Sequence, residues 1–193
     1  MVEQISYGDP HSPSQAEMLP GVTPSSASFQ RRLLERDQTC AICTACGHPE
    51  PIVPSSIHGV HIIPAKHRQF WDSRGLSRTI TDQSVLGSDD LMSSCDNGIV
   101  LCQRHEHDLA NFYISIHPET HVIVSFQPPT AELHGLKITT PWDCQNPLLP
   151  PPNKDVLHLH FVSCISRWIG RHAYAREPDS DSLSSGSDIE SDE

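Results

Sequence analysis

Two short-spaced pairs of metal-binding side chains stand out along the chain. Cys40 and Cys43 are separated by two residues, and Cys102 and His105 repeat that spacing further on. Two such pairs on separate turns are the usual arrangement of a structural zinc site with thiolate and imidazole ligands. The spacing therefore predicts a structural Zn²⁺ at these four residues. Cys46 offers a competing thiol, and free thiols that simply pack as small apolar groups are the alternative.

A second group of polar side chains lies in two segments that are rich in histidine. His61 ends a short apolar segment and is followed by Ile-Ile-Pro64. Asn97 opens a second apolar segment, and His107 belongs to the polar run that follows it. A neutral imidazole can take up a proton near neutral pH, because its ordinary pKa lies there, and it can also bind a metal ion. Histidine, asparagine and histidine are thus expected on a strand, a turn and a helix, in that order.

This order resembles the ββα-metal (HNH) nuclease family, and in particular its fungal-type members. The resemblance covers roughly residues 29 to 170, and because each motif is short, its specificity comes from the order and spacing of the motifs. The matching segments are Phe29 to Asp37 with Cys40, His61 to Pro64, Trp71, Gly75-Leu76, Ile80, Asn97 to Leu101, and His107 to Leu109.

The resemblance implies hydrolysis of a phosphodiester bond with one divalent metal ion, Mg²⁺ or a transition metal. His61 matches the family's general base, which deprotonates water, and Asn97 matches the residue that fixes the loop carrying this base. His107 matches the metal ligand on the helix if Leu109 is aligned with the family's leucine. Counting from Asn97 without a gap puts Glu106 there instead, and a carboxylate also binds hard metal ions. Both ligands stay open at this point.

The chain departs from the family's pattern at three positions. Val60 stands where many members carry a further metal ligand, and Ala110-Asn111 replaces a Phe-Asp pair. The departures predict a weak metal site, or one completed by Glu106 or Asp108. Two functions therefore stay open: a metal-dependent endonuclease, and a catalytically degenerate, zinc-stabilised module that binds protein or nucleic acid. A regulatory protein that acts through its acidic tail is a third.

The side chains described above must be positioned by helices and strands. The order of the predicted elements indicates an α+β fold, with a ββα-metal core between N- and C-terminal helices. Apolar residues recur at helical spacing near both ends of the central part of the chain, and β-branched residues mark the short strands. The predicted helices cover residues 29–37, 104–111 and 156–169, and the predicted strands cover residues 60–63, 97–101, 113–116 and 122–126.

The composition divides the chain into a central part and two biased ends. Serine, proline and glycine dominate the beginning, and serine with acidic residues dominates the end, so both ends are expected to be disordered. The predicted divisions are a disordered segment (1–28), an HNH-like core (29–126), a proline-rich linker (127–153), a helix that packs on the core (154–176) and an acidic disordered tail (177–193).

The net charge of −11 comes mostly from the ends of the chain. Residues 31–176 carry all 13 Lys and Arg residues against 14 acidic residues, so the central part is nearly neutral. A nearly neutral central part does not argue against nucleic acid as the partner, but it lacks the excess of basic residues that would argue for one. Four arginines near the motifs are candidates for contacts with phosphate: Arg68, Arg74, Arg78 and Arg104.

The sequence also indicates where the protein is located and whether its cysteines are oxidised. No apolar run reaches the length of a membrane span, and no basic segment followed by an apolar stretch suggests a secretory signal. We therefore expect a protein that is neither membrane-bound nor secreted, in the nucleus or the cytoplasm. The seven cysteines are an odd number, and four of them cluster with histidines, which favours reduced thiols and metal binding over disulfides.

Overall fold

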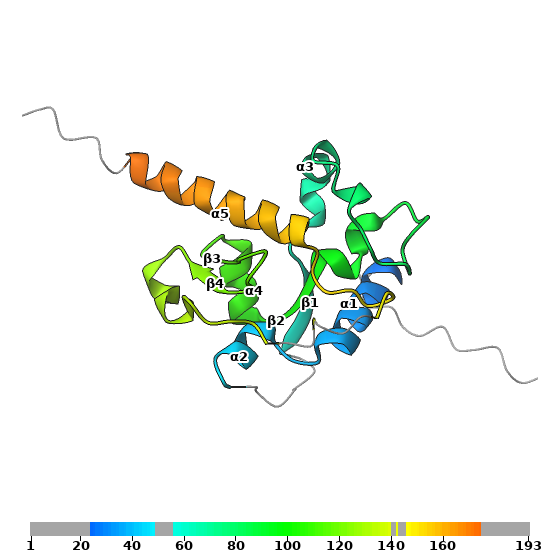
Figure 1. Cartoon of the computed structure of the whole chain (residues 1–193), viewed down its shortest axis with the longest axis horizontal. Coiled ribbons are helices and arrows are strands. Elements are labelled where there is room, and N and C mark those ends of the chain that lie inside the picture. Colours follow the sequence, from blue (N-terminus) through cyan, green and yellow to red (C-terminus); the bar gives the residue numbers. More distant parts are fainter. Residues whose placement is uncertain (1–23, 49–55, 140–141, 143–145, 175–193) are drawn as a thin grey trace, which may run out of the picture.

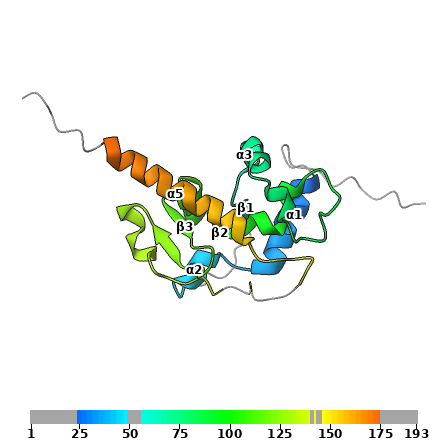
Figure 2. The same cartoon turned by 45° about the horizontal axis from the view of Figure 1, so that its top comes forward.

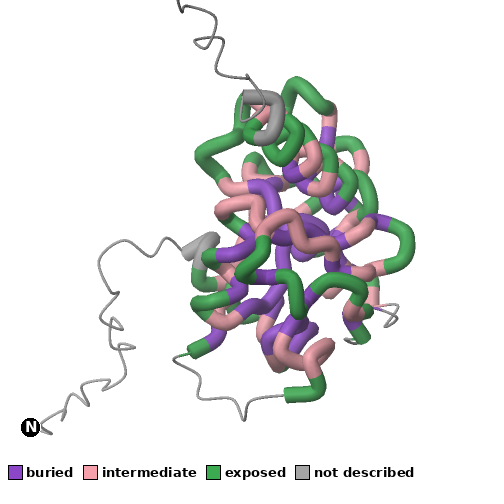
Figure 3. The backbone as a smooth tube through the Cα atoms, turned by 90° about the vertical axis from the view of Figure 1, so that its left-hand side faces the viewer, coloured by how far each residue is buried: buried purple, intermediate pink, exposed green. Residues whose placement is uncertain are grey.

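The fold was obtained as a computed structural model that describes residues 24–48, 56–139, 142 and 146–174. Helices surround two small antiparallel sheets of two strands each (Figure 1), which confirms the predicted α+β class with flanking helices. Buried residues run through the centre of the fold and exposed residues cover its outside (Figure 3). The acidic tail and most of the N-terminal segment predicted to be disordered lie outside the described residues.

The elements follow one another in nearly the order that the sequence predicts. The α-helices are α1 (Pro24–Asp37), α2 (Ala41–Ala45), α3 (Arg68–Ser73), α4 (Gln103–Ala110) and α5 (Lys154–Tyr174). The strands are β1 (Ile57–His61), β2 (Gly98–Cys102), β3 (Ile114–Ile116) and β4 (Ile123–Ser125). Short 3-10 helices cover Ala65–His67, Leu76–Arg78, Leu91–Ser93, Cys95–Asn97 and Pro128–Leu133.

Strands β1 and β2 form the sheet that carries the candidate site. They pair antiparallel with His61 opposite Gly98, so the end of β1 lies beside the start of β2. Helix α1 packs closely against this end of the sheet. A Cβ atom on Gly98 would lie 2.6 Å from Leu33 Cδ1 and 2.9 Å from Phe29 Cε2, so any side chain here would have to displace these two side chains of α1. Glycine at this position therefore lets α1 approach His61.

A buried ion pair at the end of α1 ties several segments together. The guanidinium of Arg36 donates to both carboxylate oxygens of Asp37, at 2.6 and 2.9 Å. It also donates to the carbonyl oxygens of Cys95, Gly98 and Pro150, at 2.9, 2.8 and 2.6 Å. All five N–H donors of the arginine are thereby used, as a buried charge requires. The pair fixes α1, the start of β2 and the segment before α5 relative to one another.

Asp37 extends this network to the far edge of β2. Its carboxylate accepts from the backbone N–H of Val100 at 3.0 Å and from the indole N–H of Trp142 at 3.2 Å. Val100 faces β1 through Gly59 in the strand register, and the carboxylate satisfies an N–H that would otherwise be buried without a partner. The ion pair therefore also satisfies a backbone N–H group of β2 that is buried.

Helix α5 packs against the second sheet through its N-terminal half. His160 is nearly fully buried, and its Nε2–H donates to the carbonyl oxygen of Leu109 at 3.2 Å while its Nδ1 accepts from the hydroxyl of Ser115 at 2.8 Å. Burial lowers the pKa of His160 to about 4, so the imidazole is neutral near pH 7. The C-terminal half of α5 extends away from the sheets (Figures 1 and 2). Within the described residues no helix, α5 included, has the length and apolarity needed to cross a membrane.

The helix predicted for residues 156–169 is longer in the structure (Lys154–Tyr174), and three further predicted segments also differ. The first helix begins at Pro24 instead of Phe29, because proline is well suited to the first turn of a helix, where its missing N–H is not needed. The first strand is Ile57–His61 instead of 60–63, because pairing with β2 sets its bounds. Part of the predicted linker packs on the core, since Pro128–Leu133 is helical and Trp142 is buried.

We expect Arg36→Met to lower the free energy of unfolding by about 3 kcal/mol or more, because removing one partner leaves the Asp37 carboxylate buried without its counter-charge. Urea unfolding followed by tryptophan fluorescence measures this. Arg31→Met is the control, since Arg31 is exposed on the same helix and its loss should cost less than about 0.5 kcal/mol. Equal losses in both variants would contradict the role given to the buried pair.

Candidate functional site

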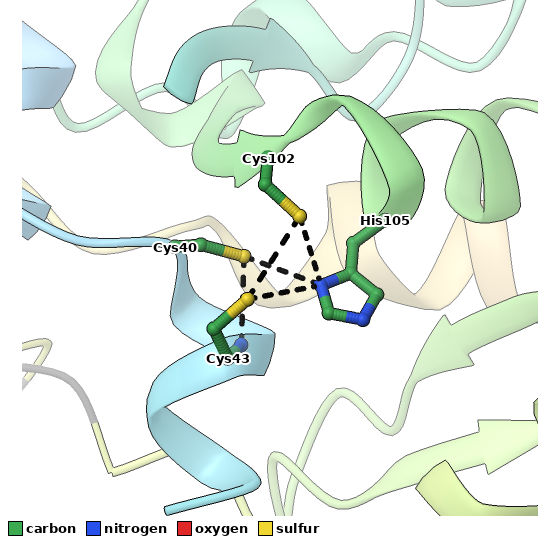
Figure 4. Close-up of side chains that lie close together, drawn as sticks. All are labelled: Cys40, Cys43, Cys102 and His105. Atoms are coloured by element: carbon green, nitrogen blue, oxygen red, sulfur yellow. Dashed lines mark hydrogen bonds between the residues drawn. The ribbon is translucent and has the colours of Figure 1, made fainter. Parts of the chain in front are cut away.

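Four metal-binding side chains that are far apart in the sequence meet at the junction of α2, β2 and α4 (Figure 4). Cys40 precedes α2 and Cys43 lies within it, while Cys102 ends β2 and His105 lies in the first turn of α4. Their ligand atoms all lie within 4.8 Å of one another. The structure thus brings together the two pairs that the sequence singles out, and the competing Cys46 is not part of this group.

The distances within this cluster fit a shared tetrahedral ion. His105 Nδ1 lies 3.4, 3.5 and 3.3 Å from the sulfurs of Cys40, Cys43 and Cys102. The sulfurs of Cys43 and Cys102 are 3.8 Å apart. Zinc bonds of about 2.3 Å to sulfur and about 2.0 Å to nitrogen, at tetrahedral angles, separate two sulfurs by about 3.8 Å and sulfur from nitrogen by about 3.5 Å. The four residues can therefore bind a metal ion such as zinc.

The ionisation of the cluster also bears on metal binding. Burial raises the pKa of the Cys40 and Cys43 thiols and lowers the pKa of the His105 imidazole. The imidazole is therefore already in its neutral, ligating form, whereas the thiols must lose their protons when a metal ion binds.

His61 lies half-buried at the end of β1, in contact with α1. Its ring stacks on the ring of Phe29, with centroids 4.1 Å apart and an interplanar angle of 11°. Burial lowers the pKa of His61, and the negative charge of Asp90 opposes this only in part. The Nε2 atom is buried and has no hydrogen-bond partner among the described residues. A neutral imidazole is in the form that can accept a proton.

Asn97 is fully buried and binds the loop that follows His61. Its side-chain oxygen accepts from the backbone N–H of Ile63 at 2.8 Å, and its amide group donates to the carbonyl oxygen of Ile63 at 3.0 Å. The same amide group also donates to the carbonyl oxygen of Met92 at 3.0 Å. The backbone oxygen of Asn97 accepts from Ile62 N at 2.9 Å. One asparagine thus fixes both residues that come directly after His61.

A cavity of about 1220 Å³ opens beside His61 between β1, α3, α4 and α5. Glu106 lines this cavity, whereas His107 does not. Successive helical residues point about 100° apart, so only one of the two can face His61. His107 is exposed instead, and its Nδ1 lies 3.2 Å from the side-chain nitrogen of Asn111. Asp108, the other carboxylate that the sequence offers to the metal site, is buried near His105 and does not line the cavity.

Two residues line or contact the site although no sequence pattern assigns them to it. Phe29 belongs to the predicted first helix, but only the packing of α1 on β1 brings its ring against His61. Arg167 comes from α5, far from every motif, and still lines the same cavity. An aromatic residue or an arginine on an amphipathic helix has no distinguishing spacing, so the tertiary structure alone reveals them.

Comparison with known proteins supports the resemblance seen in the sequence. Residues 40–117 match the family described as HNH endonuclease. The matched segment includes the metal-binding cluster, His61, Asn97 and Glu106, and it leaves α1 and α5 outside. No curated protein and no solved structure matches the chain significantly. The family match supports the predicted HNH fold, while the fungal-type assignment stays a prediction.

We expect the purified protein to contain one zinc ion per chain, and Cys43→Ser to lose it, because a hydroxyl is a poor replacement for a thiolate ligand. Elemental analysis together with native mass spectrometry measures the metal content. Cys46→Ser is the matched control, since Cys46 lies in the adjoining turn outside the cluster and its variant should keep the ion. Wild-type protein without zinc, or equal loss from both variants, would contradict this site.

Proposed function

We propose that this chain is a metal-dependent HNH-type endonuclease that hydrolyses phosphodiester bonds of nucleic acid. The observation that carries the proposal is the arrangement around one cavity, which His61 and Glu106 both line while Asn97 fixes the loop that follows His61. The family match over residues 40–117 supports it independently.

In the proposed reaction His61 is the general base. Its imidazole takes a proton from the water that attacks phosphorus, and its lowered pKa keeps it neutral and available near pH 7. Stacking on Phe29 limits rotation of the ring, and the bonds from Asn97 to Ile63 hold the backbone that follows it. The base is therefore pre-positioned before substrate binds, which lowers the entropy cost of the step.

Glu106 is the residue we propose as ligand of the catalytic metal ion. Mg²⁺ typically keeps several waters and is bound by one or two carboxylates together with oxygens of a phosphate substrate, so a single carboxylate in the cavity fits this ion. The bound ion would polarise the scissile phosphate and stabilise the leaving oxygen. His107, the alternative ligand from the sequence, would have to turn from the exposed face of α4 to reach the same cavity.

The metal-binding cluster has a structural role in this proposal. Its four ligands connect α2 with the end of β2 and the first turn of α4. A zinc ion held there would fix the direction in which α4 leaves the sheet, and thereby the position of Glu106. Structural zinc sites contribute directly to folding free energy, so the ion is expected to stabilise the whole ββα unit.

The alternative function is a catalytically degenerate, zinc-stabilised module that binds nucleic acid or protein. The observation that favours it is the scarcity of metal ligands, since Glu106 is the one carboxylate among the described residues that line the cavity, and Val60 lines it where the family often has a further ligand. Under this alternative the cavity would bind its partner without hydrolysis.

We expect His61→Ala to lower metal-dependent plasmid nicking by a factor of about 10² to 10⁴, which is the usual contribution of a general base. Asn97→Ala should also lower the rate, because the loop after His61 loses its anchors. Nicking is measured with added Mg²⁺ or Mn²⁺, and circular dichroism checks that each variant is folded. A His61→Ala enzyme as active as the wild type would overturn the assignment of the base.

We expect Glu106→Ala to abolish nicking and His107→Ala to retain it, because only Glu106 lines the cavity that His61 shares. The two residues are neighbours on α4, so each variant is the control for the other. The nicking rate is measured over a range of Mg²⁺ concentrations, since loss of a ligand weakens the response to metal. The reverse pattern would assign the ligand to His107.

The nicking rate should fall only below the ordinary histidine pKa of about 6.5, because burial lowers the pKa of His61 and protonation removes the base. Phe29→Leu removes the stacked ring and exposes the imidazole, which should move the acidic limb of the profile towards higher pH. The pH dependence of the rate in both proteins tests this. An unchanged acidic limb in Phe29→Leu would contradict the role of the stack.

A further inference from the structure

The cavity beside His61 carries a positive lining in a chain whose net charge is −11. Three fixed cations line it, Lys66 and Arg74 from the side of α3 and Arg167 from α5, against the single carboxylate of Glu106. The cavity is therefore complementary to an anion, although the chain as a whole is acidic.

Five basic residues are held in ion pairs among the described residues, and the cations of the cavity are not among them. Within the described part of the chain, none of the three forms an ion pair with a carboxylate. The arginines and lysine that are paired all lie outside the cavity lining, and they are Arg32, Arg36, Arg68, Arg104 and Lys154. Two of the four arginines expected from the sequence to contact phosphate, Arg68 and Arg104, are thus neutralised by carboxylates.

Aromatic rings hold both arginines of the lining. The guanidinium of Arg167 lies 4.4 Å from the centre of the Phe112 ring, and that of Arg74 lies 5.3 Å from the centre of the Phe70 ring. Phe112 is itself fixed, because its ring also stacks on buried His160 with centroids 5.2 Å apart. An aromatic ring orients a guanidinium without neutralising it, so both arginines keep their charge for a ligand.

We propose that α3 and α5 are the two walls of a phosphate clamp, in which Arg74 and Arg167 bind backbone phosphates of a nucleic acid on either side of His61. The proposal rests on the proposed function and extends it, since it assigns substrate binding to a helix outside the matched segment 40–117. Both views show α3 and α5 as separate elements beside β1 (Figures 1 and 2), and the cavity between them is lined by residues of all three. A strand that passes over His61 therefore meets both walls.

The test is a binding measurement that does not require cleavage. Full-length protein is titrated into labelled single-stranded DNA, the matching duplex and RNA of the same sequence, without added Mg²⁺, over a range of salt concentrations. The variant is Arg74→Gln with Arg167→Gln. Its matched control is Arg31→Gln with Arg171→Gln, because both of these arginines are exposed and lie outside the cavity lining.

We expect the variant to bind at least tenfold more weakly than the wild type and the control to bind nearly as well as the wild type. Each phosphate contact contributes about 0.7 for a single strand, or about 0.9 for a duplex, to the slope of log affinity against log salt concentration. Two lost contacts should therefore lower the slope by about 1.4 or about 1.8, respectively. Comparison of the three nucleic acids shows which one the clamp prefers.

The outcomes separate this proposal from the proposed function. Equal affinity and equal slope in variant and control, with a wild type that nicks plasmid, would overturn the clamp and leave the nuclease. Loss of affinity in the variant alone, with a wild type that never nicks, would overturn the nuclease and leave the clamp in a binding module. A wild type that binds none of the three nucleic acids would overturn both.

Discussion

The rest of the structure depends on the buried pair of Arg36 and Asp37. Two charges taken out of water are costly unless every donor and acceptor finds a partner, and here all five donors of the guanidinium do. The partners belong to α1, to the start of β2 and to the segment before α5. These contacts hold the three parts together, with α1 packed on the β1–β2 sheet and α5 packed on β3 of the second sheet.

Strand β2 connects the two candidate sites, although it is only five residues long. Asn97 lies directly before the strand and holds the loop after His61, whereas Cys102 ends the strand and belongs to the metal-binding cluster. All five residues of β2 pair with β1 and all but Cys102 are buried, so the strand is held along its length. Stabilisation of the cluster at one end should therefore also hold α4, and with it Glu106, against the cavity at the other end.

The distribution of charge explains how an acidic chain can offer a site for a polyanion. Most carboxylates lie in the terminal segments or in ion pairs, and the cavity retains cations that pair with no carboxylate among the described residues. Electrostatic attraction acts over about one Debye length, roughly 8 Å in physiological salt, so the local charge of a concave site matters more than the net charge of the chain.

The sequence by itself determined the elements and the pairs of residues that act locally. The spacing of Cys40 and Cys43, and of Cys102 and His105, identified the two pairs that form the candidate metal site, because ligands separated by two residues on a turn lie close together. Only the tertiary structure decided that Glu106 lines the cavity in place of His107, that Phe29 stacks on His61, and that Arg167 lines the cavity from α5. These contacts join helices that are distant in sequence, and their direction depends on how α1, α4 and α5 pack on the sheets, which no local pattern encodes.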